Sequence, residues 1–209
     1  SLIQHGPNCA GPYLIVRAMY PGPRGLWKQL LSELIATPGC EIQWDDVGSY
    51  YSMNNKLMGY AQEPDLLPYP ENVLALSPRQ EKQTRFYDKP LGVAGWRKMV
   101  DHLRSAPTTM KIGPQMVIEP AGAAINDRRR GENAYIHRRS DFNTYLNTYW
   151  DSEEEKPKAF AFMNRWLEIG EPWSNGEAYQ NYPKPYITDW SRRYFVEYYP
   201  ELSLRKRKY

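Results

Sequence analysis

The sequence Tyr179-Gln180-Asn181-Tyr182-Pro183 opens the part of the chain that decides how the rest is interpreted. Polar and aromatic residues fill it and a proline ends it, which predicts a short strand. On a strand, Tyr179 and Asn181 share one face, whereas Gln180 and Tyr182 point the other way.

A helix is predicted after this strand, over residues 187–199. Trp190, Tyr194 and Tyr198 recur at intervals of four, which places their rings on one helical face. Pro200 then stops or restarts the helix, because proline lacks the amide hydrogen that a helix interior requires.

Composition indicates a folded protein and excludes several classes. The 209 residues suit one domain or slightly more, and 41% are hydrophobic and 24% charged. The net charge of +3 is too small to indicate a nucleic-acid partner. No run of about 18 apolar residues predicts a membrane span. No leader is visible and no location is indicated, but the chain begins with Ser1 instead of Met, which suggests a missing upstream part.

Cysteine and histidine spacing predicts no metal site. Cys9 and Cys40 set no disulfide framework, and free thiols are the favoured interpretation over a disulfide. The three histidines lie far apart in sequence and have no zinc-ligand spacing with the cysteines.

Strand and helix patterns predict an α+β fold. The expected extended segments are 12–20, 41–44, 83–90, 110–120, 135–138 and 142–150. The expected helices are 24–36, 47–59, 91–105 and 152–170. Residues 62–82 hold four prolines and no period, which predicts a long surface loop. We therefore expect a mainly antiparallel β-sheet with helices packed on one face and the other face left for a ligand or partner.

Two further stretches bear on binding. In residues 142–150, Asn143, Tyr145, Asn147 and Tyr149 fall on one face of a strand, which is therefore rich in rings and hydrogen-bonding groups. For Tyr145 and Asn147, contact with substrate and simple hydration are equally open. Residues 127–132 contain three consecutive arginines; a solvated turn is favoured there over a phosphate site.

The C-terminal residues resemble the C-terminal segment of the berberine-bridge-enzyme-like flavin oxidases. That segment reads Tyr-x-Asn-Tyr-Pro, then a Trp, an aromatic pair, a Leu and Lys-x-Lys-Tyr. The matching residues are Tyr179, Asn181, Tyr182, Pro183, Trp190, Tyr194, Phe195, Leu202, Lys206, Lys208 and Tyr209. The Asp-Pro that usually follows in the family is absent, which we interpret as trimming or disorder.

The middle of the chain carries the same resemblance. Residues 118–126 are similar to the family's Glu-Pro-x-Gly-Gly-Ala-Ile, with Ala123 in place of the second glycine. Residues 135–138 are similar to its Phe-Pro-His-Arg; His137 is expected to be structural and Arg138 to anchor the sheet or a loop. The likeness covers residues 86–209 well and the first 85 residues loosely.

The resemblance implies two functional parts. Residues 1–178 resemble a substrate-binding α+β domain, and residues 179–209 resemble the segment that packs toward the flavin domain. The sequence has no Gly-rich phosphate-binding loop and no match to the family's His and Cys that bond the flavin. FAD is therefore expected to come from an FAD-binding partner chain or a cleaved N-terminal half.

The resemblance also implies roles for individual residues. Oxidation of an alcohol by a flavin needs a base for the hydroxyl proton and a hydride acceptor. A tyrosine can be that base only if its pKa falls well below about 10. The implied roles are catalytic for Tyr179, cofactor-binding for Asn181 and Tyr182, and substrate-binding for Tyr145, Asn147 and Gln180.

The favoured hypothesis is the substrate-domain part of an FAD-dependent oxidase. It would transfer a hydride from a sugar-like, aromatic or natural-product alcohol to the flavin, with O2 as the final acceptor. Activity would require the flavin-binding partner. The alternative is a non-catalytic module that binds a ligand or assembles subunits.

Overall fold

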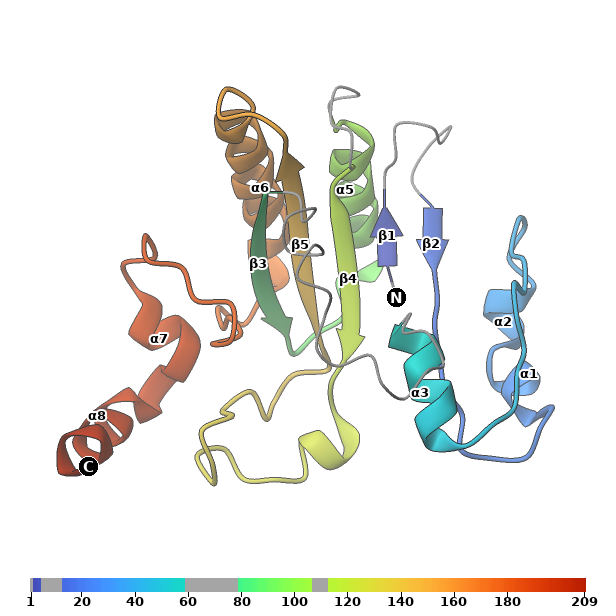
Figure 1. The fold of residues 1–209 in the computed structure, drawn as a ribbon, viewed down its shortest axis with the longest axis horizontal. Coiled ribbons are helices and arrows are strands. Elements are labelled where there is room, and N and C mark those ends of the chain that lie inside the picture. Colours follow the sequence, from blue (N-terminus) through green and yellow to red (C-terminus); the bar gives the residue numbers. More distant parts are fainter. Residues whose placement is uncertain (1, 5–12, 59–78, 107–112) are drawn as a thin grey trace. The chain divides into compact units, whose positions relative to one another are not determined.

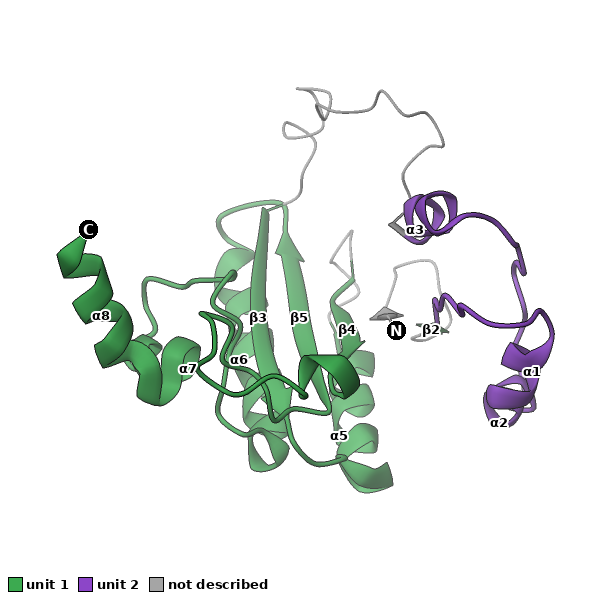
Figure 2. Ribbon diagram, turned by 90° about the horizontal axis from the view of Figure 1, so that it is seen from below, with its two compact units in different colours: residues 1–15, 78–209 green, residues 16–77 purple. Residues whose placement is uncertain are grey.

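The computed structural model describes residues 2–4, 13–58, 79–106 and 113–209. The chain forms two compact units, residues 1–15 with 78–209 and residues 16–77 (Figure 2). The boundary expected at residue 178 separates functional parts and remains a prediction.

A five-stranded antiparallel sheet organises the first unit (Figure 1). Its strands are β1 (Leu2–Gln4), β2 (Tyr13–Ile15), β3 (Arg79–Tyr87), β4 (Gln115–Pro120) and β5 (Phe142–Trp150). They lie in the order β2-β1-β4-β5-β3, so β3 is an edge strand and β5 pairs along its full length with it. The predicted α+β fold with a mainly antiparallel sheet is confirmed.

Two long helices, α5 (Gly92–Arg104) and α6 (Lys156–Gly170), pack on one face of the sheet (Figure 1). Met116 and Leu146 are paired across β4 and β5 and point toward these helices. The buried core consists of Tyr87, Leu91, Met99, Leu103, Ala106, Met116, Leu146, Phe162, Met163 and Trp166. The predicted packing of helices on one face is therefore confirmed. No helix in the described ranges has the length and apolarity to cross a membrane.

The opposite side of the long strands is polar and aromatic, as the alternation in residues 142–150 predicted. Side chains alternate along a strand, so Tyr145 and Asn147 lie on the side opposite Leu146. We call this side the polar face. Its members are Gln80, Lys82, Thr84, Gln115, Val117, Glu119, Asn143, Tyr145, Asn147 and Tyr149.

The described residues of the second unit form three helices, α1 (Leu26–Leu30), α2 (Ser32–Ile35) and α3 (Tyr50–Met58). The single helix predicted over 24–36 is divided at Leu31, whose backbone angles leave the helical region. The strand predicted at 41–44 is wrong, because no strand in the described part pairs with it. Cys40 is a free, exposed thiol, whereas Cys9 lies outside the described residues.

Several boundaries in the first unit also differ from the predictions. β2 covers only Tyr13–Ile15 of the strand expected at 12–20. β3 begins at Arg79, inside the loop expected at 62–82; the loop's residues 62–78 lie outside the described part. Residues 135–138 form no strand, because the Arg138 amide donates to the Ile136 carbonyl oxygen at 2.8 Å and closes a tight turn. The 3-10 helix η1 (Ala123–Ile125) follows β4.

The C-terminal part begins with the 3-10 helix η2 (Glu171–Trp173). After an irregular segment come α7 (Trp190–Phe195), η3 (Val196–Tyr198) and α8 (Tyr199–Lys208). Pro200 lies in the first turn of α8, so it restarts the helix. The aromatic stripe divides, because Tyr194 is buried while Trp190 is 40% exposed and packs on Tyr199.

Candidate functional site

The segment around Tyr179 is a turn fixed to the edge strand β3. The Phe86 amide donates to the Glu177 carbonyl oxygen at 3.2 Å, and the Tyr179 amide donates to Thr84 Oγ1 at 2.7 Å. The Tyr182 amide then donates to the Tyr179 carbonyl oxygen at 3.1 Å. The predicted strand at 179–183 is wrong. These hydrogen bonds close a turn, whereas a strand would require a regular ladder of backbone hydrogen bonds to a neighbouring strand.

Four tyrosines gather beside the polar face. The Tyr179 ring centre lies 5.7 Å from that of Tyr182 and 6.0 Å from that of Tyr135. Tyr182 in turn lies 6.0 Å from Tyr145. Lys82 Nζ lies 4.8 Å from the ring centres of both Tyr145 and Tyr182, a cation–π distance. We call these five residues the tyrosine cluster.

The turn changes which side chains accompany Tyr179. Tyr182 was predicted to point away from Tyr179, and this is wrong, because strand alternation does not apply to a turn. Asn181 stays with Tyr179: its Nδ2 donates to the phenolic oxygen at 2.8 Å. A donor in this position interacts more strongly with the oxygen as the oxygen gains negative charge. Asn181 therefore places a hydrogen-bond donor on the phenolic oxygen of the predicted catalytic residue.

Burial holds the neighbouring phenols in the protonated form. It raises the pKa of Tyr145, Tyr182 and Tyr135, and the Glu119 carboxylate raises the first two further. Burial lowers the pKa of Lys82, against the opposing attraction of Glu119. At neutral pH these tyrosines can therefore donate hydrogen bonds to a ligand.

The raised pKa values predict how stability responds to alkali. Unfolded phenols ionise near pH 10, whereas the buried ones keep their protons to higher pH. The native state then binds more protons than the unfolded state, so stability falls as pH rises above about 10. Phenolate absorbance should rise together with loss of the near-ultraviolet circular dichroism. Full ionisation near pH 10 with the dichroism retained would contradict this.

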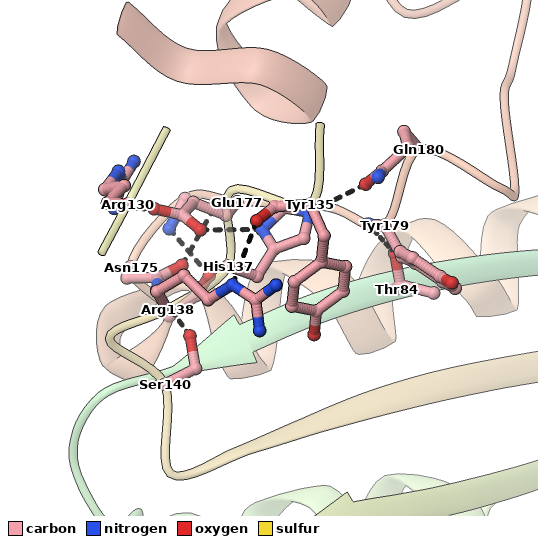
Figure 3. A network of polar contacts seen from close by, with 12 residues as sticks. Thr84, Arg130, Tyr135, His137, Arg138, Ser140, Asn175, Glu177, Tyr179 and Gln180 are labelled. Carbon is pink, nitrogen blue, oxygen red and sulfur yellow. Dashed lines mark hydrogen bonds and ion pairs between the residues drawn. The ribbon is translucent and has the colours of Figure 1, made fainter. Parts of the chain in front are cut away.

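A buried network of polar contacts joins the Tyr179 turn to His137 and Glu177 (Figure 3). His137 is fully buried and stacks on Phe86 with ring centres 3.9 Å apart. Its Nδ1 lies 2.7 Å from Glu177 Oε2, and its Nε2 lies 3.0 Å from Gln180 Oε1. Both ring nitrogens are engaged, in agreement with the structural role predicted for His137. Gln180 faces His137 in this arrangement, and its contact with substrate remains a prediction.

Glu177 joins this network to the loop between β4 and β5. Its side chain is 8% exposed and pairs with Arg130 at 2.8 Å as well as with His137. Arg130 also pairs with Glu197 at 2.9 Å. A continuous chain of polar contacts therefore runs from Arg130 through Glu177 and His137 to the Tyr179 turn (Figure 3).

The two predicted β5 residues lie in different surroundings. Tyr145 belongs to the tyrosine cluster. Asn147 is 4% exposed, and its Oδ1 has no hydrogen-bond partner among the residues that the structure describes. Asn143 Oδ1 is likewise buried without a hydrogen-bond partner among the described residues. A buried acceptor without a donor costs about 1–3 kcal/mol, so a ligand hydroxyl at either position would be stabilising.

The sequence predictions missed three residues of this site. Lys82 fell within the predicted loop, and Thr84 in a segment to which no role was given. Glu177 had no motif around it. A period of two in Gln80, Lys82, Thr84 and Phe86 was the one available signal, and charged residues on the opposite side of β3 obscured it.

The residues present fit one part of FAD. The tyrosine cluster, which includes Tyr182, offers rings and hydrogen-bonding groups suited to a flat polar ring, and Asn181 donates to Tyr179 within it. The sequence has no Gly-rich loop of the kind that surrounds a diphosphate. Within the described ranges, no group of three His, Cys, Asp or Glu residues could hold a metal ion.

The fold of this chain is similar to that of several solved structures. BBE-like 1 of Physcomitrella patens superposes with a TM-score of 0.74 at 17% identity, over 100% of this chain and 44% of that one. Wild-type Phl p 4, a glucose dehydrogenase, superposes with a TM-score of 0.71 at 18% identity, over 90% of this chain and 42% of that one. A variant of berberine bridge enzyme superposes with a TM-score of 0.68 at 13% identity, over 87% of this chain and 40% of that one.

The chain therefore has the fold of a part of the berberine-bridge-enzyme-like proteins, and the resemblance predicted from the sequence is confirmed in the fold. It spans less than half the length of each of these structures. No protein-family model matches the chain, and no curated protein matches it by sequence.

Proposed function

We propose that this chain is the substrate-binding part of an FAD-dependent oxidoreductase that oxidises an alcohol. One observation carries the proposal: the Tyr179 turn is bonded to β3, so that Tyr179 and Asn181 join the tyrosine cluster beside the polar face. This is the face opposite α5 and α6. The proposed functional parts are residues 1–178, which bind substrate, and 179–209, which pack toward the flavin domain.

The chemistry of this chain is the removal and placement of one proton. As the phenolate, the Tyr179 oxygen would take the proton of the substrate hydroxyl and become a neutral phenol. The Asn181 amide would stabilise the phenolate before this transfer. When bound, FAD supplies the hydride acceptor, and O2 is the final acceptor. Asn181 and Tyr182 would contact the flavin ring.

The remaining residues would bind and orient the substrate. Tyr145 would donate from its protonated phenol, and Asn147 would accept from a substrate hydroxyl. Such paired groups favour a polyhydroxylated, sugar-like alcohol over an apolar one. Two proteins of similar structure support the same substrate class: Phl p 4, a glucose dehydrogenase, and the glycopeptide hexose oxidase DBV29, which superposes with a TM-score of 0.52 at 15% identity.

FAD would be held by an FAD-binding partner chain or a cleaved N-terminal half. Support comes from the absence of a Gly-rich phosphate loop in the sequence and from the span of this chain, less than half of each matched structure. We use "the complete protein" for this chain together with that flavin-binding part.

The proposed activity can be tested without oxygen. The flavin-loaded complete protein is mixed anaerobically with aldoses, aromatic alcohols and aliphatic alcohols, and loss of oxidised-flavin absorbance is followed. We expect reduction by at least one aldose. A flavin that no alcohol reduces would overturn the proposal.

Asn181→Ala should slow flavin reduction by about tenfold to a hundredfold. The variant removes a hydrogen bond that would favour the phenolate, the form of Tyr179 that takes the proton, and hydrogen bonds to charged groups contribute about 1.5–3 kcal/mol. Substrate affinity should change little, because Asn181 is assigned to the proton-transfer step. An unchanged reduction rate at saturating substrate would show that the amide plays no part in that step.

A further inference from the structure

A second polar site lies in the loop between β4 and β5. Five arginines line an open pocket of 470 Å³: Arg128, Arg129, Arg130, Arg138 and Arg139. We call it the arginine pocket. Its volume is in the range of small-molecule sites, about 300–1,000 Å³, and is larger than a lone ion requires.

The pocket depends on a specific loop conformation. Gly131 has a φ of +83°, which favours glycine, and a Cβ there would overlap the Tyr198 ring. The Tyr198 hydroxyl donates to the Arg130 carbonyl oxygen at 2.8 Å. These contacts hold the loop beside Arg138 and Arg139, which come from the approach to β5. Residues 127–129 and Glu132 are exposed, as the solvated turn predicted from the sequence requires, and the pocket lies on this turn.

Two of the five guanidinium groups are neutralised within the protein. Arg130 pairs with Glu177 and Glu197, and Arg128 pairs with Glu132 at 2.9 Å. Arg130 is only 11% exposed, so it is fixed in place. Neutralised in this way, these two arginines shape the pocket more than they attract a ligand.

None of the other three guanidinium groups forms an ion pair with a carboxylate in the part of the chain that the structure describes. Glu132, which accepts from the Arg129 amide at 3.2 Å, attracts the Arg129 guanidinium without pairing with it. Arg138 donates to the carbonyl oxygens of Tyr135 and Ile125 and to Asn133 Oδ1. The guanidinium groups of Arg129 and Arg139 form no hydrogen bond or ion pair with any residue in the described part of the chain. The lining contains a single carboxylate, Asp127, so positive charge is in excess.

We propose that the arginine pocket binds a phosphorylated small molecule. A guanidinium group donates in a planar fork that matches phosphate oxygens. The unbonded forks of Arg129 and Arg139, beside the charge of Arg138, suit an anion with several charged oxygens. The Oδ1 atom of Asn126, also in the lining, is buried without a partner among the described residues and would accept a ligand hydroxyl. This site does not depend on the proposed oxidase activity.

Calorimetric titration of the complete protein with inorganic pyrophosphate, at ionic strength held constant with NaCl, tests the proposal. We expect one site per chain. Arg129→Gln combined with Arg139→Gln should weaken binding at least tenfold without changing Tm, because neither guanidinium is bonded. The control combines Arg104→Gln with Arg165→Gln, two exposed arginines on α5 and α6, and should bind pyrophosphate normally.

Absence of pyrophosphate binding, or equal weakening in both double variants, would overturn the proposal. If the pocket variant fails to fold, Arg139→Gln alone gives the same comparison with Arg165→Gln. Citrate binding as tightly as pyrophosphate would overturn the phosphate class. Repeating the titration with saturating FAD separates two sources of phosphate: unchanged affinity indicates a separate phosphorylated ligand, and competition indicates the diphosphate of FAD.

Discussion

Replacing Tyr179 with phenylalanine should slow reduction of the flavin by substrate about a hundredfold to ten-thousandfold, the range typical of a lost general base. The phenolic oxygen is the atom to which Asn181 donates at 2.8 Å, and the phenylalanine variant removes it while keeping the ring. Flavin binding should therefore be retained. Stopped-flow absorbance under anaerobic conditions measures the reduction step alone.

The matched control is Tyr149→Phe. Tyr149 is another phenol of the polar face, and its hydroxyl donates to Gln115 Oε1 at 3.0 Å, outside the tyrosine cluster. Its loss should change the reduction rate only by a small factor. If substrate reduces the flavin as fast in the Tyr179→Phe variant as in the Tyr149→Phe variant, Tyr179 is not the base.

Glu177→Ala should destabilise the complete protein by about 3–5 kcal/mol, the range for breaking a buried ion pair from one side. The substitution leaves the buried His137 without a carboxylate and leaves Arg130 with only the exposed Glu197 as its partner. It should also loosen the Tyr179 turn, because the chain of contacts from His137 to Gln180 loses its anchor. Urea unfolding at equilibrium gives the free energy.

Glu197→Ala is the control for Glu177→Ala. Glu197 pairs with the same arginine, but its side chain is 53% exposed. Exposed ion pairs contribute about 1 kcal/mol or less, so this variant should unfold nearly as the parent does. Similar losses in the two variants would mean that the burial of Glu177 does not matter.

Elements with strong local patterns could be predicted from the sequence. The helix at 91–105 and the helix that ends at Gly170 were predicted close to their observed bounds, because apolar spacing and helix-terminating residues agree there. The two faces of β5 were also predicted, since each face keeps its own chemistry along nine residues. These regions correspond to the core.

Features that depend on distant residues could not be predicted. The Tyr179 turn is closed by Thr84 Oγ1, 95 positions away, and nothing in its own sequence indicates this partner. The arginine pocket likewise requires Tyr198 to fix Gly131. Local pattern wrongly favoured a strand in the first case. In the second it correctly favoured a solvated turn but did not indicate the tertiary contacts that bring the arginines together.

The absorbance spectrum of the complete protein, purified under native conditions, tests the central claim most directly. If the tyrosine cluster and the polar face contact a flavin that is held by the flavin-binding part, the protein will be yellow and contain one FAD per chain. The Tyr182→Leu substitution will then shift the absorbance bands of the flavin. A colourless protein that takes up no added FAD would contradict the proposal and leave a non-catalytic binding module.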